Sequence, residues 1–274
     1  MIKRDWRKRE LEDLADYIAT ESGMDNLPVD VAAIAEDNGL TYCLGNYEEY
    51  FDGMLQYEDG RFHIYINNRG HFSLSTARIR FSFAHELGHF FIDEHRLVLE
   101  SGTSLHHPSK YCFEQRNPVE KEADYFASCL LMPSSVFSEE CTGKFSFKKL
   151  EELGKRFGVS LPAVASRYMD YGSMPIALVC AKDGKIQYKL FSNDFPYKWL
   201  KTDYTQKVPL LTCAGDFFAN GVKCDDTEQI DAKEWFSTYD DLDGVSVNEH
   251  CIYQEKYGQT LSILWFDKIP SNEM

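Results

Sequence analysis

The segment His85-Glu86-Leu87-Gly88-His89 decides how the rest of the chain is interpreted. It lies within residues 75–91, whose apolar residues have helical spacing and which begin at Ser75, a residue suited to cap a helix. Residues four positions apart on a helix project from the same face. His85 and His89 can therefore direct both imidazoles at one cation, while Glu86, about 100° away around the helix, lies beside that cation.

This arrangement predicts a catalytic zinc site. Two imidazoles and one further ligand leave zinc a fourth position for water, whose pKa the metal lowers toward neutrality. A carboxylate beside the metal can then accept the water's proton. We assign that role to Glu86 and expect His85 and His89 to bind Zn²⁺. The alternative for so short a motif is two surface histidines on an amphipathic helix.

The third ligand has two candidates. His95 has the spacing of an extended HExxHxxGxxH motif, but Ile92 stands where that motif needs glycine, and a β-branched residue resists positive φ. Glu120 shares a predicted helix face with Asp124, which can hold a ligand histidine by its other ring nitrogen. We favour Glu120 as the ligand with Asp124 behind it. Glu122 and His95 are the fallback ligands.

The rest of the chain predicts an α+β protein. Residues 6–40 are expected to be helical, and two alternating runs, 53–57 and 61–67, flank Asp59-Gly60 as in a β-hairpin. Residues 93–117 are expected to form a loop-rich excursion. Residues 145–169 have helix-turn-helix spacing, and short strand-like runs follow. The expected domains are a catalytic domain with a small sheet and active-site helix (1–140), a helix-turn-helix-like segment (141–173) and a C-terminal mixed α/β domain (174–274).

Composition indicates a globular protein and limits its partners. The hydrophobic fraction of 43% is typical of chains that form a core. No apolar run approaches the roughly 20 residues that span a bilayer, and no secretory signal is visible. The eight cysteines form no CxxC pair, so we expect reduced thiols and a cytoplasmic protein.

Charge argues against nucleic acid as a nonspecific partner. The formal net charge of −15 would repel the phosphate backbone. Residues 224–249 contain nine acidic residues and one lysine. We interpret this run as a solvated face, with a docking surface for a basic partner as the alternative.

Two motifs of this sequence resemble the core of the ImmA/IrrE-type metallopeptidases. They are Arg78–His89 and Glu120–Pro133, the second containing Ala123-Asp124, Phe126-Ala127 and Leu130-Leu131-Met132-Pro133. The resemblance covers residues 10–170. It implies a zincin-like fold in which an extended substrate lies along the edge of the sheet, at strand 61–67 or its hairpin partner. It also implies zinc ligands His85, His89 and Glu120, with Glu86 as the catalytic base.

The resemblance further implies a biological role. Members typically cleave a helix-turn-helix repressor and so switch on stress-response or mobile-element genes. The strands of the C-terminal domain suggest a sensor or substrate-recognition domain, and its analogue in the family is a small-molecule-sensor-like fold. One alternative is a DNA-binding regulator that uses residues 145–169 and holds a structural zinc. Another is an accessory protein that binds a toxin or repressor without cutting it. The balanced charge of residues 145–169 disfavours DNA binding, and a structural zinc site has no use for Glu86.

Overall fold

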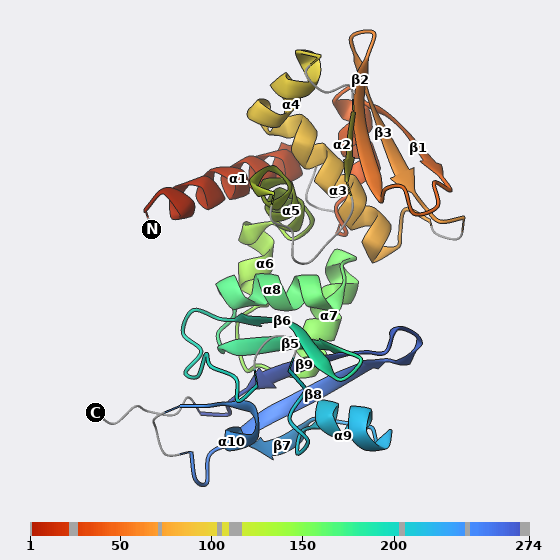
Figure 1. Ribbon diagram of the computed structural model, residues 1–274. Coiled ribbons are helices and arrows are strands. Elements are labelled where there is room, and N and C mark those ends of the chain that lie inside the picture. The colour runs from red at the N-terminus through yellow and green to blue at the C-terminus, as the bar shows by residue number, and fades with distance from the viewer. Residues whose placement is uncertain are drawn as a thin grey trace. The chain divides into compact units, whose positions relative to one another are not determined.

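The computed structural model describes residues 2–21, 27–70, 73–102, 106–109, 117–202, 206–238 and 242–268, and the statements below concern these. The chain divides into two compact units. We call them the N-terminal unit, residues 1–140 and 151–164, and the C-terminal unit, residues 141–150 and 165–274. The predicted α+β class is confirmed (Figure 1). The division into three domains stays a prediction.

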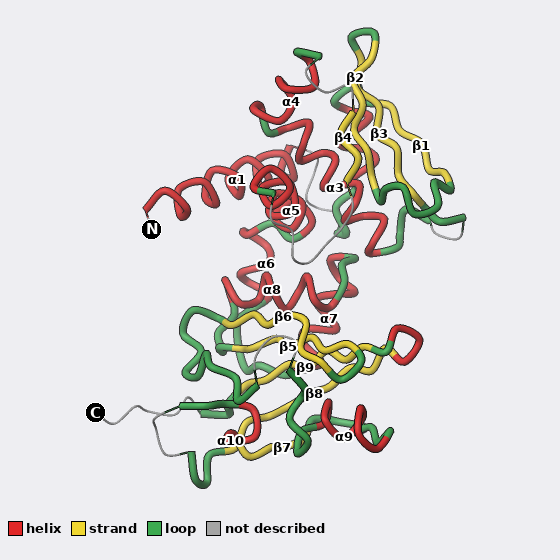
Figure 2. Tube along the Cα trace, viewed as in Figure 1, coloured by secondary structure: helices red, strands yellow, loops and turns green. Residues whose placement is uncertain are grey.

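The N-terminal unit contains a four-stranded sheet of order β1-β3-β2-β4. Its strands are β1 (Thr41–Gly45), β2 (Gly53–Glu58), β3 (Arg61–Asn67) and β4 (His106–Ser109). β1 pairs with β3 in parallel, and β2 pairs antiparallel with both β3 and β4 (Figure 2). The predicted hairpin is confirmed, because Asp59 and Gly60 both have positive φ, as a two-residue hairpin turn requires.

The edge of this sheet differs from the expected one. Because β4 pairs with β2, the hairpin strands β2 and β3 both lie inside the sheet, and β1 and β4 are its edges among the described residues. The expectation that strand 61–67 or its partner forms the edge is therefore wrong. β4 comes from the stretch that was expected to be loop-rich, and its pairing across 50 residues of chain leaves no local sequence signal.

Helices pack on this sheet and on one another. They are α1 (Ile2–Glu21), α2 (Val31–Asp37), α3 (Ala77–Phe91), α4 (Asp93–Glu100), α5 (Pro118–Leu131) and α6 (Ser134–Glu140). α3 contacts β2 and β3 on one side and α5 on the other (Figure 1). The helical spacing predicted its buried face, because Ile79, Phe83 and Leu87 are all almost fully buried.

Two boundaries were predicted less well. The N-cap of α3 is Thr76, one residue after the expected Ser75, and it makes no side-chain capping hydrogen bond. The stretch after α3 continues as the amphipathic helix α4, with His95 and Leu99 buried one turn apart. This helix places His95 beside His89 of α3.

The C-terminal unit is built on a five-stranded antiparallel sheet of order β6-β5-β9-β8-β7. The strands are β5 (Ile176–Lys182), β6 (Lys185–Phe191), β7 (Glu228–Asp231), β8 (Ser246–Gln254) and β9 (Gln259–Trp265). Its shorter elements are α9 (Cys213–Asn220), α10 (Ala232–Trp235) and the 3-10 turn Glu255–Tyr257. The predicted pair of helices around Gly158 is confirmed as α7 (Phe147–Phe157) and α8 (Leu161–Tyr171).

One buried carboxylate ties the C-terminal unit together. Glu249 on β8 is fully buried. It accepts hydrogen bonds from the amides of Cys213 and Ala214 at the start of α9, from Trp235 Nε1 and from Ser262 Oγ. Burial raises the pKa of Glu249 and these four donors oppose the rise. The carboxylate thereby links two helices to the sheet.

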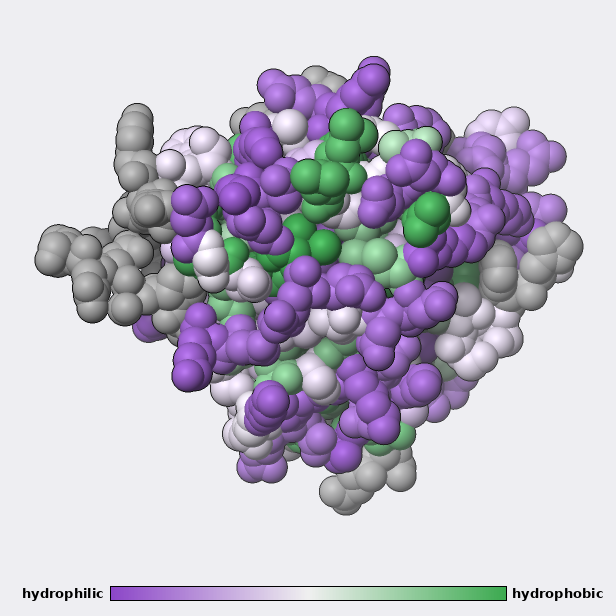
Figure 3. Space-filling model, turned by 90° about the horizontal axis from the view of Figure 1, so that it is seen from below, coloured by the Kyte–Doolittle hydropathy of each residue, from purple (hydrophilic) through white to green (hydrophobic). Residues whose placement is uncertain are grey.

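The surface agrees with the acidic composition. Hydrophilic side chains cover most of the face in Figure 3, with a hydrophobic group near its centre. Within the acidic run, Asp225, Asp226, Glu228 and Asp243 are exposed, as a solvated face requires, whereas Glu249 is buried. Asp240 and Asp241 lie outside the described residues. Among the helices that the structure describes, none is long and apolar enough to span a membrane.

Candidate metal centre

Helix α3 places two imidazoles side by side. His85 Nε2 and His89 Nε2 are 3.1 Å apart, and both side chains are buried. Glu86 is fully buried and lies against Gly53 of β2, where a Cβ atom would come within 2.5 Å of Glu86 Oε1. The glycine in β2 therefore makes room for the carboxylate between α3 and the sheet.

Helix α5 brings a third donor to the same point. The two carboxylate oxygens of Glu120 lie 3.4 Å from His85 Nε2 and 3.4 Å from His89 Nε2. This approach depends on Gly88, because a Cβ there would lie 3.2 Å from the Cα of Ala123 on α5. The small residue between the two histidines thus lets α3 and α5 pack closely at the level of the three donors.

These donors fit a zinc ion. Tetrahedral zinc with bonds of roughly 2.0–2.2 Å separates its ligand atoms by about 3.3 Å. The two Nε2 atoms are 3.1 Å apart, His85 Nε2 lies 3.4 Å from one oxygen of Glu120 and His89 Nε2 lies 3.4 Å from the other. One ligand atom from each of the three buried side chains lies within 4.8 Å of the other two. Two imidazole nitrogens and one carboxylate are also a donor set that zinc prefers.

Asp124 holds His85 from behind. Its Oδ1 lies 2.8 Å from His85 Nδ1. Such a contact fixes the hydrogen on Nδ1 and leaves the lone pair of Nε2 for a metal. Burial opposes the charged form of His85, but the hydrogen bonds that its ring donates to Asp124 and Glu120 raise the pKa of His85 to about 10 in the metal-free protein.

The fallback ligands lie outside this group of three. His95 Nδ1 faces His89 Nδ1 at 3.2 Å, on the side of the His89 ring away from Nε2. Glu122 Oε2 lies 3.4 Å from His95 Nε2 and 2.7 Å from Arg7 Nη2 on α1. Burial lowers the pKa of His95. Sequence reasoning missed Arg7, because nothing local in a basic N-terminal helix indicates a partner more than a hundred residues away.

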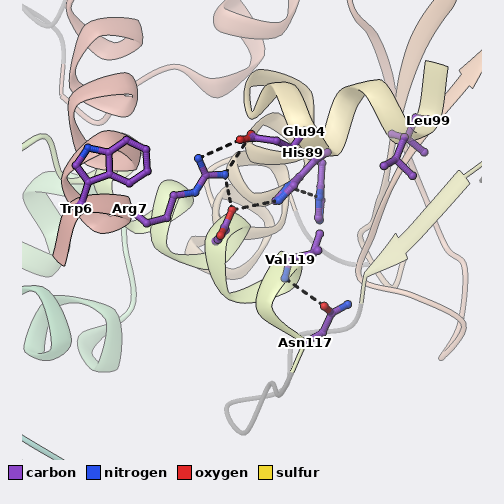
Figure 4. A pocket seen from close by; sticks show the side chains of 10 residues that line it. Trp6, Arg7, His89, Glu94, Leu99, Asn117 and Val119 are labelled. Atoms are coloured by element: carbon purple, nitrogen blue, oxygen red, sulfur yellow. Dashed lines mark hydrogen bonds and ion pairs between the residues drawn. The ribbon is translucent and has the colours of Figure 1, made fainter. Parts of the chain in front are cut away.

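A cavity of about 830 Å³ borders this group (Figure 4). His89, His95, Glu122 and Arg7 form part of its lining, and Trp6, Val98, Leu99 and Val119 supply a large apolar part. Hydrogen bonds beside apolar surface are stronger because less water competes for them.

Two histidines and a glutamate from two packed helices, with a second glutamate buried beside them and a small sheet alongside, define a metallopeptidase of the zincin-like class. The family model of the IrrE N-terminal-like domain, peptidase family M78, matches residues 51–169. Residues 51–169 therefore form an IrrE N-terminal-like domain, and the resemblance to the ImmA/IrrE-type metallopeptidases seen in the sequence is confirmed.

Comparison with solved structures supports the fold. A structure described as a Mycobacterium tuberculosis transcriptional regulator has a TM-score of 0.58 and 18% identity, over 94% of this chain and 76% of that chain. At this identity the likeness concerns the fold alone. A comparison with curated proteins found no match.

Proposed function

We propose that this chain is a zinc-dependent endopeptidase that cleaves a partner protein. In this proposal His85, His89 and Glu120 bind zinc and Glu86 is the general base. The observation that carries it is the convergence of three buried donors within 4.8 Å of one another, with the buried carboxylate of Glu86 on the same helix as the two histidines. Membership of a peptidase family supports a protein as the substrate.

Each residue of the proposed site has its own role in the reaction. A zinc ion held there would polarise the scissile carbonyl and lower the pKa of the attacking water. Glu86 takes the proton from that water and delivers it to the leaving amide nitrogen. Its burial against Gly53 keeps the carboxylate in one place. Asp124 keeps His85 in the tautomer that binds metal.

The finer parts of the proposal come from the family. We infer that the substrate is a helix-turn-helix repressor, that its cleavage switches on stress-response or mobile-element genes, and that the reaction takes place in the cytoplasm. The seven described cysteines are free thiols, which agrees with a reducing compartment. The C-terminal unit would recognise the substrate or a signal.

Direct DNA binding is the less favoured reading of α7 and α8. The single arginine of the second helix, Arg167, is 2% exposed. Its guanidinium lies 4.7 Å from the centre of the Tyr171 ring. A buried arginine cannot contact phosphates or base edges, so this helix pair is better suited to packing.

The test compares wild type with Glu86→Gln. We expect equal zinc content and a loss of repressor cleavage of about 10²- to 10⁴-fold, the contribution of a general base. Glu58→Gln, at the exposed end of β2, is the control and should cleave normally. Retained cleavage in Glu86→Gln, or a wild-type protein that binds no zinc, would refute the proposal.

A further inference from the structure

The two ligand histidines have different partners behind them. His85 is held by a carboxylate, Asp124, whereas His89 Nδ1 lies 3.2 Å from Nδ1 of another imidazole, His95. Both His89 and His95 are buried, with ring centres 5.1 Å apart. If Nε2 of His89 faces the metal, its Nδ1 carries the hydrogen and must donate it. His95 Nδ1 lies within hydrogen-bond distance and can accept it.

The contacts of His95 agree with this assignment. With Nδ1 as acceptor, a neutral His95 carries its hydrogen on Nε2, which faces Glu122 Oε2 at 3.4 Å. Glu122 in turn accepts a hydrogen bond of 2.7 Å from Arg7 Nη2. Each donor in this series therefore meets an acceptor. Figure 4 labels Arg7 and His89, the two ends of the series, and marks the contacts between them with dashed lines.

The series spans four helices. His89 lies on α3, His95 on α4, Glu122 on α5 and Arg7 on α1. Arg7 is fixed further by Glu94 at 3.2 Å and Glu10 at 2.7 Å. A side chain that is hydrogen-bonded from several helices has little rotational freedom. When such a side chain is the hydrogen-bond partner of a metal-binding histidine, it fixes the ring plane and tautomer of that histidine.

We propose that His95 is a positioning residue that orients His89 for metal binding, and that Glu122 and Arg7 hold His95 as a hydrogen-bond acceptor. This inference rests on the proposed zinc centre. It gives Glu120 and Glu122, two positions apart on α5, different tasks. Glu120 binds the metal, and Glu122 acts through His95.

The experiment measures zinc affinity by competition with a chelator in wild type and three variants. His95→Leu keeps an apolar side chain of comparable bulk and removes the acceptor. His95→Asn places an amide oxygen near the position of Nδ1 and restores it. We expect a 10- to 100-fold weaker zinc affinity in His95→Leu, which is the usual effect of removing the hydrogen-bond partner of a metal ligand. His95→Asn should recover most of that loss. His63→Asn, a histidine on β3 outside the network, should match wild type.

Two further measurements distinguish a positioning role of His95 from a role as a metal ligand and from a role in packing. The absorption spectrum of the cobalt-substituted protein reports the ligand set and should stay the same in His95→Asn. Thermal unfolding of the metal-free proteins reports packing and should differ little between His95→Leu and His95→Asn. A changed cobalt spectrum would show that His95 is a ligand and overturn the inference.

Other outcomes are equally decisive. The inference would be overturned, and the zinc centre left intact, if the zinc affinity of His95→Leu stayed within about threefold of wild type. That change is well below the usual effect of removing the hydrogen-bond partner of a metal ligand. Equal weakening in His95→Leu and His95→Asn would indicate lost packing and would also overturn it. A wild-type protein that binds no zinc would instead refute the proposed function.

Glu120 and Glu122, two positions apart on α5, allow a matched pair of substitutions. Glu120→Gln should lose stoichiometric zinc, because an amide is a poor ligand beside two imidazoles. Glu122→Gln should still bind one zinc per chain, with a weaker affinity than wild type. Stoichiometric loss in Glu122→Gln, or no change at all, would contradict the role given to Glu122.

Discussion

Replacing Gly53 by alanine is expected to disable the proposed catalytic base without disturbing the metal ligands. The φ of Gly53 is not in the left-handed region, so alanine can adopt the same backbone. Its Cβ, however, would lie 2.5 Å from Glu86 Oε1 and 3.0 Å from Glu86 Cγ, where ordinary contacts are about 3.5 Å. The carboxylate must then move by about 1 Å, and it is fully buried with no open solvent to enter.

A displacement of about 1 Å in a catalytic group can cost roughly 10²-fold in rate. We therefore expect kcat/KM for cleavage of the proposed repressor substrate to fall about 100-fold in Gly53→Ala. Zinc content should be unchanged, because His85, His89 and Glu120 meet on α3 and α5. The unfolding free energy should fall by about 1–3 kcal/mol, as for other overpacked sites.

The assay is steady-state cleavage together with metal analysis and urea unfolding. The matched control is Gly154→Ala on α7, where the new Cβ meets its nearest atom at 3.4 Å, an ordinary contact. This control should keep full activity and gain up to about 1 kcal/mol of stability. Activity of Gly53→Ala within threefold of wild type, or loss of its zinc, would refute the reasoning.

Three further predictions concern the pH dependence of metal binding, the pH dependence of stability and the C-terminal unit. The pKa of His85 is raised from 6.5 to about 10. Zinc binding near pH 8 should therefore release about one proton from His85, and zinc affinity should rise with pH until about pH 10. Calorimetry in buffers of different ionisation enthalpy measures this release, and a result without proton release would contradict the prediction. By the same shift, His85 stabilises the metal-free fold fully below pH 6.5, and this contribution is lost as the pH rises through about 10. Glu249→Ala leaves four buried donors without their acceptor and should destabilise the C-terminal unit by about 3–5 kcal/mol in urea unfolding. Its register partner Glu228 is exposed, so Glu228→Ala should cost no more than about 0.5 kcal/mol, and equal effects of the two changes would contradict the role given to Glu249.

The sequence determined the elements whose pattern is local. Helical spacing placed His85, Glu86 and His89 on one helix with the observed buried face, and Asp59-Gly60 marked the hairpin. Both patterns depend on residues a few positions apart, and the backbone period converts them directly into geometry. The family motif on α5 pointed to Glu120 and Asp124, and the structure brings both to the His pair.

Only the tertiary structure decided which distant groups surround that helix. Arg7 reaches Glu122 across 115 positions of sequence, β4 occupies a sheet edge through pairing with β2, and Gly53 faces Glu86 from a strand more than thirty residues earlier. The spacing of His95 suggested a ligand, but α4 turns its ring to the far side of His89. Such contacts depend on how helices pack against one another, which is set by the whole core and has no period in the sequence.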